Sequence, residues 1–355
     1  MIKKFNLARR FDETRELYFE YMQDINDRET VNNGYYTDCV EKYLQNLSGR
    51  KHALLTNCGS NSLLLSMMVY NIGPGDEVII TNFSCPASLT FVKTVGATPV
   101  YCDVDETGVM DPANLDGLIT DRTRAIVATG LYGDMHDHNA ISSFAKLHGI
   151  HYINDAAQSI LASKDGNTSL SCGDLVTLSF AENKIIPAIG THGALLTDST
   201  ELYYNLMHLR KHGKPYRKAP FTARGLNGVP EEDNAAQIYC STHFIEKWQK
   251  RRHEIAEYYD KEFTRRGVTM RPHDPEWNTH KYVIMTVDPF RMQQEILAEG
   301  DVETEVQYPD AFSDLPNSNI FASQCLTIPL NAHLTDAEVE IVTDTVEKVW
   351  KKNNM

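Results

Sequence analysis

The sequence lacks the features that would cross-link the chain, anchor it in a membrane or direct its export. Its 355 residues include only seven cysteines, an odd number without a CxxC or Cys/His ligand pair, so we expect neither a disulfide framework nor a metal site. The most apolar run, residues 63–72, is far shorter than the ~18 residues of a membrane span. The N-terminus has no apolar core before a cleavage site. These absences predict a cytoplasmic protein.

Positive charge is also scarce in this chain. Lys and Arg number 34 against 48 Asp and Glu, which gives a net charge of −14 with neutral His. A surface of this sign repels phosphate backbones, so nucleic-acid binding as the main role would need a clearly separated basic region. The 42% of hydrophobic residues suffices for a sizeable core, which excludes disorder over most of the chain.

Short β-rich runs alternate with helical patterns between residues 54 and 198. Continuous apolar strands with helices between them are typical of a mostly parallel sheet covered on both faces, which makes this an α/β protein. Ligands of such sheets bind at the carboxyl ends of the strands. The expected strands are residues 78–81, 99–104, 124–130, 151–155, 175–180 and 194–197.

The pattern changes near residue 230. Beyond it, long helical stretches flank only two or three strand candidates, notably residues 281–287. We therefore predict two domains. Residues 1–230 would form a large ligand-binding domain with a helical N-terminal segment, and residues 231–355 would form a smaller C-terminal α/β domain.

Three sequence features could carry chemistry. Asp155 ends an apolar strand, where most Asp residues are simply helix caps. Lys184 follows Ser179 by five residues in an apolar loop, where lost hydration would favour a reactive neutral amine, although most lysines are exposed. The polar run 57–62 opens an apolar helix, and free amides at a helix start bind phosphate.

Together these features match the requirements of pyridoxal phosphate. Its phosphate needs amides and hydroxyls, its ring nitrogen needs a carboxylate, and its aldehyde needs a lysine. The spacing of the helix start, the Asp and the Ser-x4-Lys motif is much more specific than any one of them.

At this point the sequence resembles the DegT/DnrJ/EryC1/StrS family of sugar-nucleotide aminotransferases. The resemblance implies the fold of type I pyridoxal-phosphate-dependent transferases. Several motifs carry it in the same order along the chain: GSNSLLLSMMVYNIGPGDEVIIT, TVGATPVYCDVD, AIVATGLYGDM, DAAQ, SFAENK, GTHGALLTD, LRKHG and LTIPLNAHLTDAEVEIV.

The resemblance also implies a role for each matching residue. Lys184 would form the Schiff base with the cofactor, Asp155 would pair with the ring nitrogen, and Gln158 would contact the side of the ring that carries the hydroxyl. Asn227 would reach the phosphate in a neighbouring subunit, which implies a homodimer with shared sites. The cofactor's phosphate would be bound at Ser179, Gly59, Ser60 and Asn61.

Cys85 stands where relatives place an aromatic ring that stacks on the cofactor, so the stacking partner stays open. The segment 202–230 is also distinctive, since it holds six Lys or Arg and no Asp or Glu. A nucleoside diphosphate sugar carries about two negative charges that such side chains could clamp. We therefore predict that Arg210, Arg217 and Arg224 bind the substrate, and the alternative is a solvated loop.

The implied reaction moves the amino group of L-glutamate to a nucleotide-linked keto sugar, through pyridoxal and pyridoxamine forms of the cofactor. We predict a 4-keto-6-deoxyhexose as acceptor, and a product used in surface glycans such as lipopolysaccharide O-antigen. One alternative is a dehydratase or lyase of the same family, although its branch carries histidine at the position of Lys184. The other is a non-catalytic regulatory relative that keeps the cofactor pocket.

Overall fold

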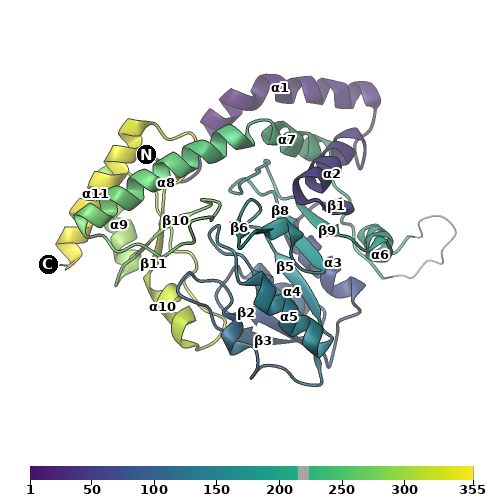
Figure 1. The fold of residues 1–355 in the computed structure, drawn as a ribbon. Helices are drawn as coiled ribbons and strands as arrows, with labels where there is room; N and C mark the ends of the chain where they lie inside the picture. Colours follow the sequence, from purple (N-terminus) through teal and green to yellow (C-terminus); the bar gives the residue numbers. More distant parts are fainter. Residues whose placement is uncertain (215–223, 355) are drawn as a thin grey trace.

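The structure is a computed structural model that describes residues 1–214 and 224–354. Helices cover both faces of a central sheet, and a smaller layer holds both chain ends (Figure 1). The helices are α1 (Leu7–Arg28), α2 (Tyr35–Ser48), α3 (Gly59–Val69), α4 (Ala87–Thr94), α5 (His138–His148), α6 (Thr200–Arg210), α7 (Glu232–Thr242), α8 (Ile245–Arg266), α9 (Pro289–Gly300), α10 (Pro316–Gln324) and α11 (Asp336–Asn354). No helix within these described residues is long and apolar enough to cross a membrane.

The central sheet has seven strands in the order β1-β9-β8-β5-β4-β2-β3. β9 runs antiparallel to both β1 and β8, whereas the other neighbours pair in parallel. This confirms the predicted α/β fold with its mostly parallel sheet. The strands are β1 (His52–Thr56), β2 (Glu77–Thr81), β3 (Thr98–Cys102), β4 (Thr123–Thr129), β5 (His151–Asp155), β8 (Leu175–Ser179) and β9 (Gly193–Thr197), with a separate hairpin of β6 (Ser163–Lys164) and β7 (Asn167–Thr168).

Alternation of apolar side chains along the strands builds a core on each face of the sheet. Leu55 packs with Leu44 of α2 and Ala235 of α7. Its neighbour Leu54 packs on the opposite face with Leu65 of α3. Successive side chains of a strand point to opposite faces, so a continuous apolar run is buried only when helices cover both.

The smaller layer has its own core around the antiparallel pair of β10 (Tyr282–Met285) and β11 (Cys325–Ile328). The N-terminus joins it, because Ile2 forms a β-bridge with Val302. α8 contributes Ile245 to the core beneath the sheet and Ile255 to this second core, and so connects the two. The division at residue 230 stays a prediction, but α7 packs with the sheet rather than with the smaller layer.

Candidate active site

Lys184 lies in the loop that follows β8, at the carboxyl edge of the sheet. Its backbone N–H donates to the Ala181 carbonyl at 3.0 Å, which fixes the turn. The side chain is half-buried, and burial lowers the pKa of Lys184 while the nearby Cys85 and Asp155 oppose that shift. A lysine whose charged form is disfavoured supplies the neutral amine that Schiff-base chemistry requires.

Asp155 ends β5, between Thr129, the last residue of β4, and Thr177 of β8. Its Oδ1 accepts from the Ala157 N–H at 3.2 Å and from the Thr177 hydroxyl at 3.3 Å. Burial raises the pKa of Asp155, and the charge of Lys184 opposes this. The predicted acid and the predicted lysine therefore share one pocket, and Asp155 Oδ2 has no hydrogen-bond donor among the described residues.

The start of α3 approaches the end of β8 so closely that only glycine fits. A Cβ added to Gly59 would lie 2.9 Å from the Cβ of Ser179 and 3.2 Å from its Oγ. A Cβ on Gly193, which pairs with Ser179, would lie 2.6 Å from the Cα of Gly59. The free amides of the first helical turn thus lie beside the Ser179 hydroxyl, an arrangement that suits an anion such as phosphate.

Asparagines tie this helix start to the segment around residue 227. Asn61 Nδ2 donates to Asn57 Oδ1 at 2.8 Å, and Asn57 Nδ2 donates to the Asn227 carbonyl at 3.1 Å. The side chain of Asn227 is exposed, as is Ser60. The structure therefore places Ser60, Asn61 and Asn227 around one helix end of the same chain, whereas the role of Asn227 at the phosphate of a neighbouring subunit stays a prediction.

Tyr308 is a site residue that the sequence did not reveal. Gln158 Oε1 accepts from the Tyr132 N–H at 3.2 Å, and Gln158 Nε2 donates to the Tyr308 hydroxyl at 3.1 Å. Burial raises the pKa of Tyr308, and Cys85 and Asp155 add to this. An aromatic ring therefore lies near Cys85, although it comes from a segment about 150 residues beyond Gln158.

Lys281 is a second lysine that sequence reasoning missed. It is buried, and its ammonium donates to Gln307, the residue before Tyr308. Burial, together with the charge of Lys184, lowers the pKa of Lys281 to about 7. The sequence showed only that Lys281 begins a strand candidate, residues 281–287. It did not show that the lysine is buried, because its neighbours come from distant segments such as that of Gln307.

The three arginines predicted to bind substrate have different positions. Arg210 is only 5% exposed, donates to the Leu55 carbonyl and to Asn33 Oδ1, and lies 3.6 Å from Glu41. We correct that prediction, because a guanidinium held by interior partners cannot also clamp a ligand. Arg224 is exposed and donates to Asn71 Oδ1 at 2.7 Å. Arg217 lies outside the described residues.

Comparison with known proteins identifies the family. The model of the DegT/DnrJ/EryC1/StrS aminotransferase family matches residues 12–347. The chain belongs to this family. Its members are aminotransferases, and the lysine, carboxylate and helix start described above are the candidate active site of this pyridoxal-phosphate-dependent aminotransferase.

Three relatives illustrate the match. UDP-2-acetamido-2-deoxy-3-oxo-D-glucuronate aminotransferase of Pseudomonas aeruginosa is 31% identical over 85% of this chain and 88% of its own. GDP-perosamine synthase of Caulobacter vibrioides is 31% identical over 87% and 88%. The solved structure of NtdA from Bacillus subtilis, with bound PMP, has a TM-score of 0.88 at 24% identity and covers 96% of this chain and 82% of that one.

The residues present fit this cofactor. The close approach of Gly59 to Ser179 brings the free amides of the first turn of α3 beside the Ser179 hydroxyl, and a phosphate can accept from both kinds of donor. A buried carboxylate and a half-buried lysine interact in the same pocket. Asp155 would hold the ring nitrogen, Lys184 the aldehyde carbon, and Ser179 the phosphate.

Proposed function

We propose that this sugar-nucleotide aminotransferase transfers the amino group of L-glutamate to a nucleotide-linked 4-keto-6-deoxyhexose, for the synthesis of a surface glycan such as O-antigen. The observation that carries the proposal is that the charges of Lys184 and Asp155 act on each other beside the α3 start, in a chain of this family. The Caulobacter relative, named for GDP-perosamine, supports a sugar of this class.

The chain's residues divide the work of such a transfer. Bound pyridoxal phosphate supplies an electron sink that stabilises negative charge at the carbon that loses its proton. Lys184 moves that proton on Nζ, because burial keeps part of its amine population neutral. Asp155 keeps its charge within the buried pocket by pairing with a protonated nitrogen.

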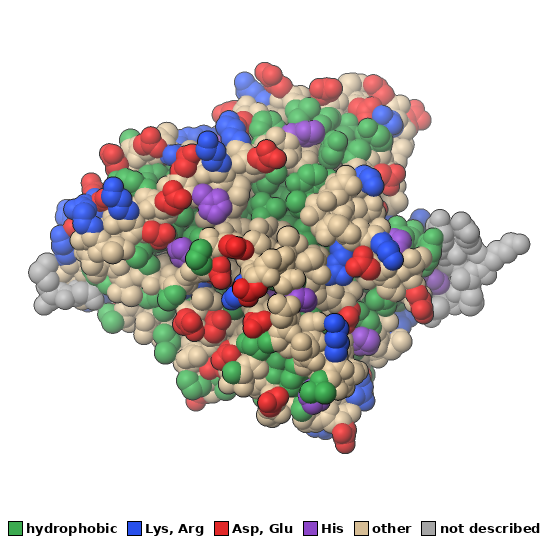
Figure 2. Space-filling model, viewed as in Figure 1, with side chains coloured by type: hydrophobic (Ala, Val, Ile, Leu, Met, Phe, Trp, Pro, Cys, Tyr) green, Lys and Arg blue, Asp and Glu red, His purple; other side chains and the backbone are tan. Residues whose placement is uncertain are grey.

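We further propose a cytoplasmic homodimer in which Asn227 reaches the partner's site. Its side chain is exposed beside the α3 start. Figure 2 shows apolar side chains exposed among the charged ones near α1 and α7, as a contact surface would require. The exposed apolar residues of this region include Phe11, Phe19, Val31, Tyr35 and Ile189.

The substrate charge would then be held by the exposed part of the basic segment. Arg224 is the described arginine of the predicted set that reaches the surface. Charge reversal at this position should raise the KM for the sugar nucleotide, because two phosphate charges lose a cationic partner. An unchanged KM would remove Arg224 from the substrate site.

A panel of keto sugar nucleotides tests the proposal. Each is incubated with the purified enzyme and glutamate, and the products are analysed by mass spectrometry. A 4-keto-6-deoxyhexose that gains an amino group is the expected result. Loss of water from the sugar without amine gain would support the dehydratase, and no turnover of any member would support a regulatory role.

A further inference from the structure

A cavity beside Lys184 is lined by an unusual number of cations. Its walls come from the N-terminal segment, the lysine loop, α8 and the segment 331–333. Arg10, Lys184 and Arg252 all line it, whereas Glu182 is the one carboxylate among the lining residues that the structure describes, and it is exposed. Cations gathered in a partly buried space favour an anionic occupant.

Arg252 is held firmly in this wall by one edge of its guanidinium. Its Nη1 donates to the carbonyls of Leu330 at 3.1 Å and His280 at 3.2 Å. Burial, together with the charge of Arg10, lowers the pKa of Arg252 to about 10. The described residues provide no carboxylate within ion-pair distance of Arg252, so its charge lacks a counter-ion.

Arg10 lies in the opposite wall, on the first turn of α1. Its Nη1 donates to the Glu182 carbonyl at 2.9 Å, two residues before Lys184. Burial lowers the pKa of Arg10 to about 10. Arg10, like Arg252, forms no ion pair with a carboxylate in the described part of the chain. The carboxylate of the nearby Glu13 does not pair with Arg10, because it contacts Lys247, Trp248 and His333.

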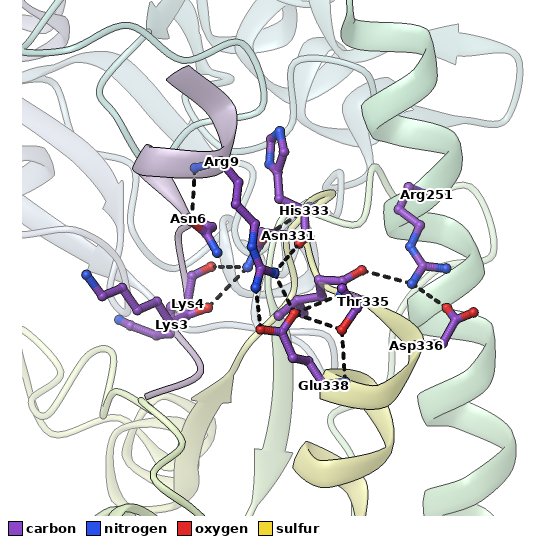
Figure 3. Close-up of polar contacts among 11 residues, drawn as sticks. Lys3, Lys4, Asn6, Arg9, Arg251, Asn331, His333, Thr335, Asp336 and Glu338 are labelled. Carbon is purple, nitrogen blue, oxygen red and sulfur yellow. Dashed lines mark hydrogen bonds and ion pairs between the residues drawn. The ribbon is translucent and has the colours of Figure 1, made fainter. Parts of the chain in front are cut away.

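The segment that carries Arg10 is fixed to the smaller layer. Asn331 Nδ2 donates to the carbonyls of Lys3 and Lys4 at 3.1 Å each, and Arg9 forms a two-point ion pair with Glu338 at 2.6 and 2.9 Å (Figure 3). The guanidinium of Arg9 is thus engaged by Glu338, while Arg10, the next residue, lines the cavity. The wall is built in advance of any ligand, which lowers the cost of binding.

We propose that Arg10 and Arg252 bind a carboxylate of the amino donor in this cavity, next to Lys184. The inference rests on the proposed function, because glutamate is the donor there. A carboxylate accepts two parallel hydrogen bonds from a guanidinium and would neutralise both cations. Because Lys184 lines the same cavity, binding at this wall would hold the donor beside the lysine loop.

Glutarate, a five-carbon dicarboxylate without an amino group, is the probe. Its Kd for the cofactor-loaded enzyme is measured by calorimetry, for wild type and for Arg10→Gln. We expect the Kd to rise by about tenfold or more in Arg10→Gln, as for loss of a desolvated charge partner. Arg10→Lys should recover part of the affinity. Arg15→Gln is the matched control, with an expected Kd equal to that of wild type, because Arg15 is an exposed arginine of the same helix that does not line the cavity.

The proposal is overturned if Arg10→Gln binds glutarate as well as wild type does, or if Arg15→Gln weakens binding equally. KM values distinguish a carboxylate of the amino donor from a carboxylate of the sugar. The KM for glutamate should rise in Arg10→Gln while the KM for the sugar nucleotide stays constant, and the reverse would assign the site to a sugar acid and overturn the proposal. Because glutarate is not converted, its binding can hold even if the sugar panel shows no turnover.

Discussion

The surroundings of Arg210 and those of Lys184 differ in a way that separates structural from functional cations. Both residues follow recognisable motifs, and burial lowers the pKa of each. Arg210 has a carbonyl, an amide oxygen and a carboxylate around it. Lys184 Nζ has no hydrogen-bond or ion-pair partner among the described residues. A cation removed from water without partners is costly unless a ligand supplies them. Arg10 and Arg252 donate to carbonyls but, like Lys184, have no carboxylate partner among the described residues.

Removal of the Lys184 amine is the largest expected change. Lys184→Ala should lower the rate of 2-oxoglutarate formation from glutamate by about 10²–10⁴-fold, because the proton shuttle is lost. The exposed Lys42→Ala serves as the control and should keep the wild-type rate. Equal rates in Lys184→Ala and wild type would break the comparison, since an available amine would then have no function.

Arg210→Met should act on stability instead. Loss of one partner of a buried ion pair typically costs about 3 kcal/mol of unfolding free energy, which urea titration measures. The KM for the sugar nucleotide should stay unchanged. A raised KM with unaltered stability would restore Arg210 to the substrate site.

Glu41, the ion-pair partner of Arg210, should also make stability depend on pH. Burial raises its pKa to about 7, above the ordinary value of 4.5, so the folded state binds its proton more tightly. This contribution to stability is complete below about pH 4.5 and is lost as the pH rises through 7. Between pH 5 and 8, wild type should therefore lose more unfolding free energy than Glu41→Gln. Parallel curves for the two proteins would contradict this.

The phosphate side of the pocket should respond to a single methyl group. Gly59→Ala places a Cβ against Ser179, and an overpacked contact of this kind costs about 1–3 kcal/mol. We expect the Kd for pyridoxal phosphate to rise by about tenfold. Gly117→Ala is the control, because its Cβ would meet nothing within 4 Å. The same Kd in both variants would show that α3 can shift without loss of the site.

Tyr308→Phe should have the smallest effect. It keeps the ring near Cys85 and removes the hydrogen bond with Gln158, which is worth about 1 kcal/mol. Cofactor affinity measured by fluorescence titration should fall by about fivefold. Tyr308→Ala should weaken it further. Equal losses in the two variants would mean that the ring itself contributes nothing.

Local sequence patterns were sufficient for the sheet and for much of the site. The run at 151–155 coincides with β5 and ends on Asp155, because apolar strands and the polar residues after them are neighbours in the chain. Gly59, Ser179 and Lys184 likewise lie next to strand or helix ends. Asp155 and Ser179 converge because β5 and β8 pair in parallel, and Gly59 reaches the same edge because β1 and β8 both pair antiparallel with β9 and so run in the same direction.

Long-range packing was beyond these patterns. Tyr308 reaches Gln158 across about 150 residues, and the ammonium of Lys281 depends on Gln307. Arg210 is enclosed by partners from α2 and the turn before it, which no local motif indicates. From its charge alone, Arg210 was predicted to bind substrate. Its contacts with buried partners show that its role is structural.

The central claim is that this chain moves an amino group onto a sugar nucleotide by means of Lys184. The most direct measurement supplies ¹⁵N-labelled glutamate and a keto sugar nucleotide to wild type and to Lys184→Ala, and follows the label by mass spectrometry. The account predicts ¹⁵N in the sugar nucleotide formed by wild type and none with Lys184→Ala. Consumption of the keto sugar by wild type without label in the product would contradict it.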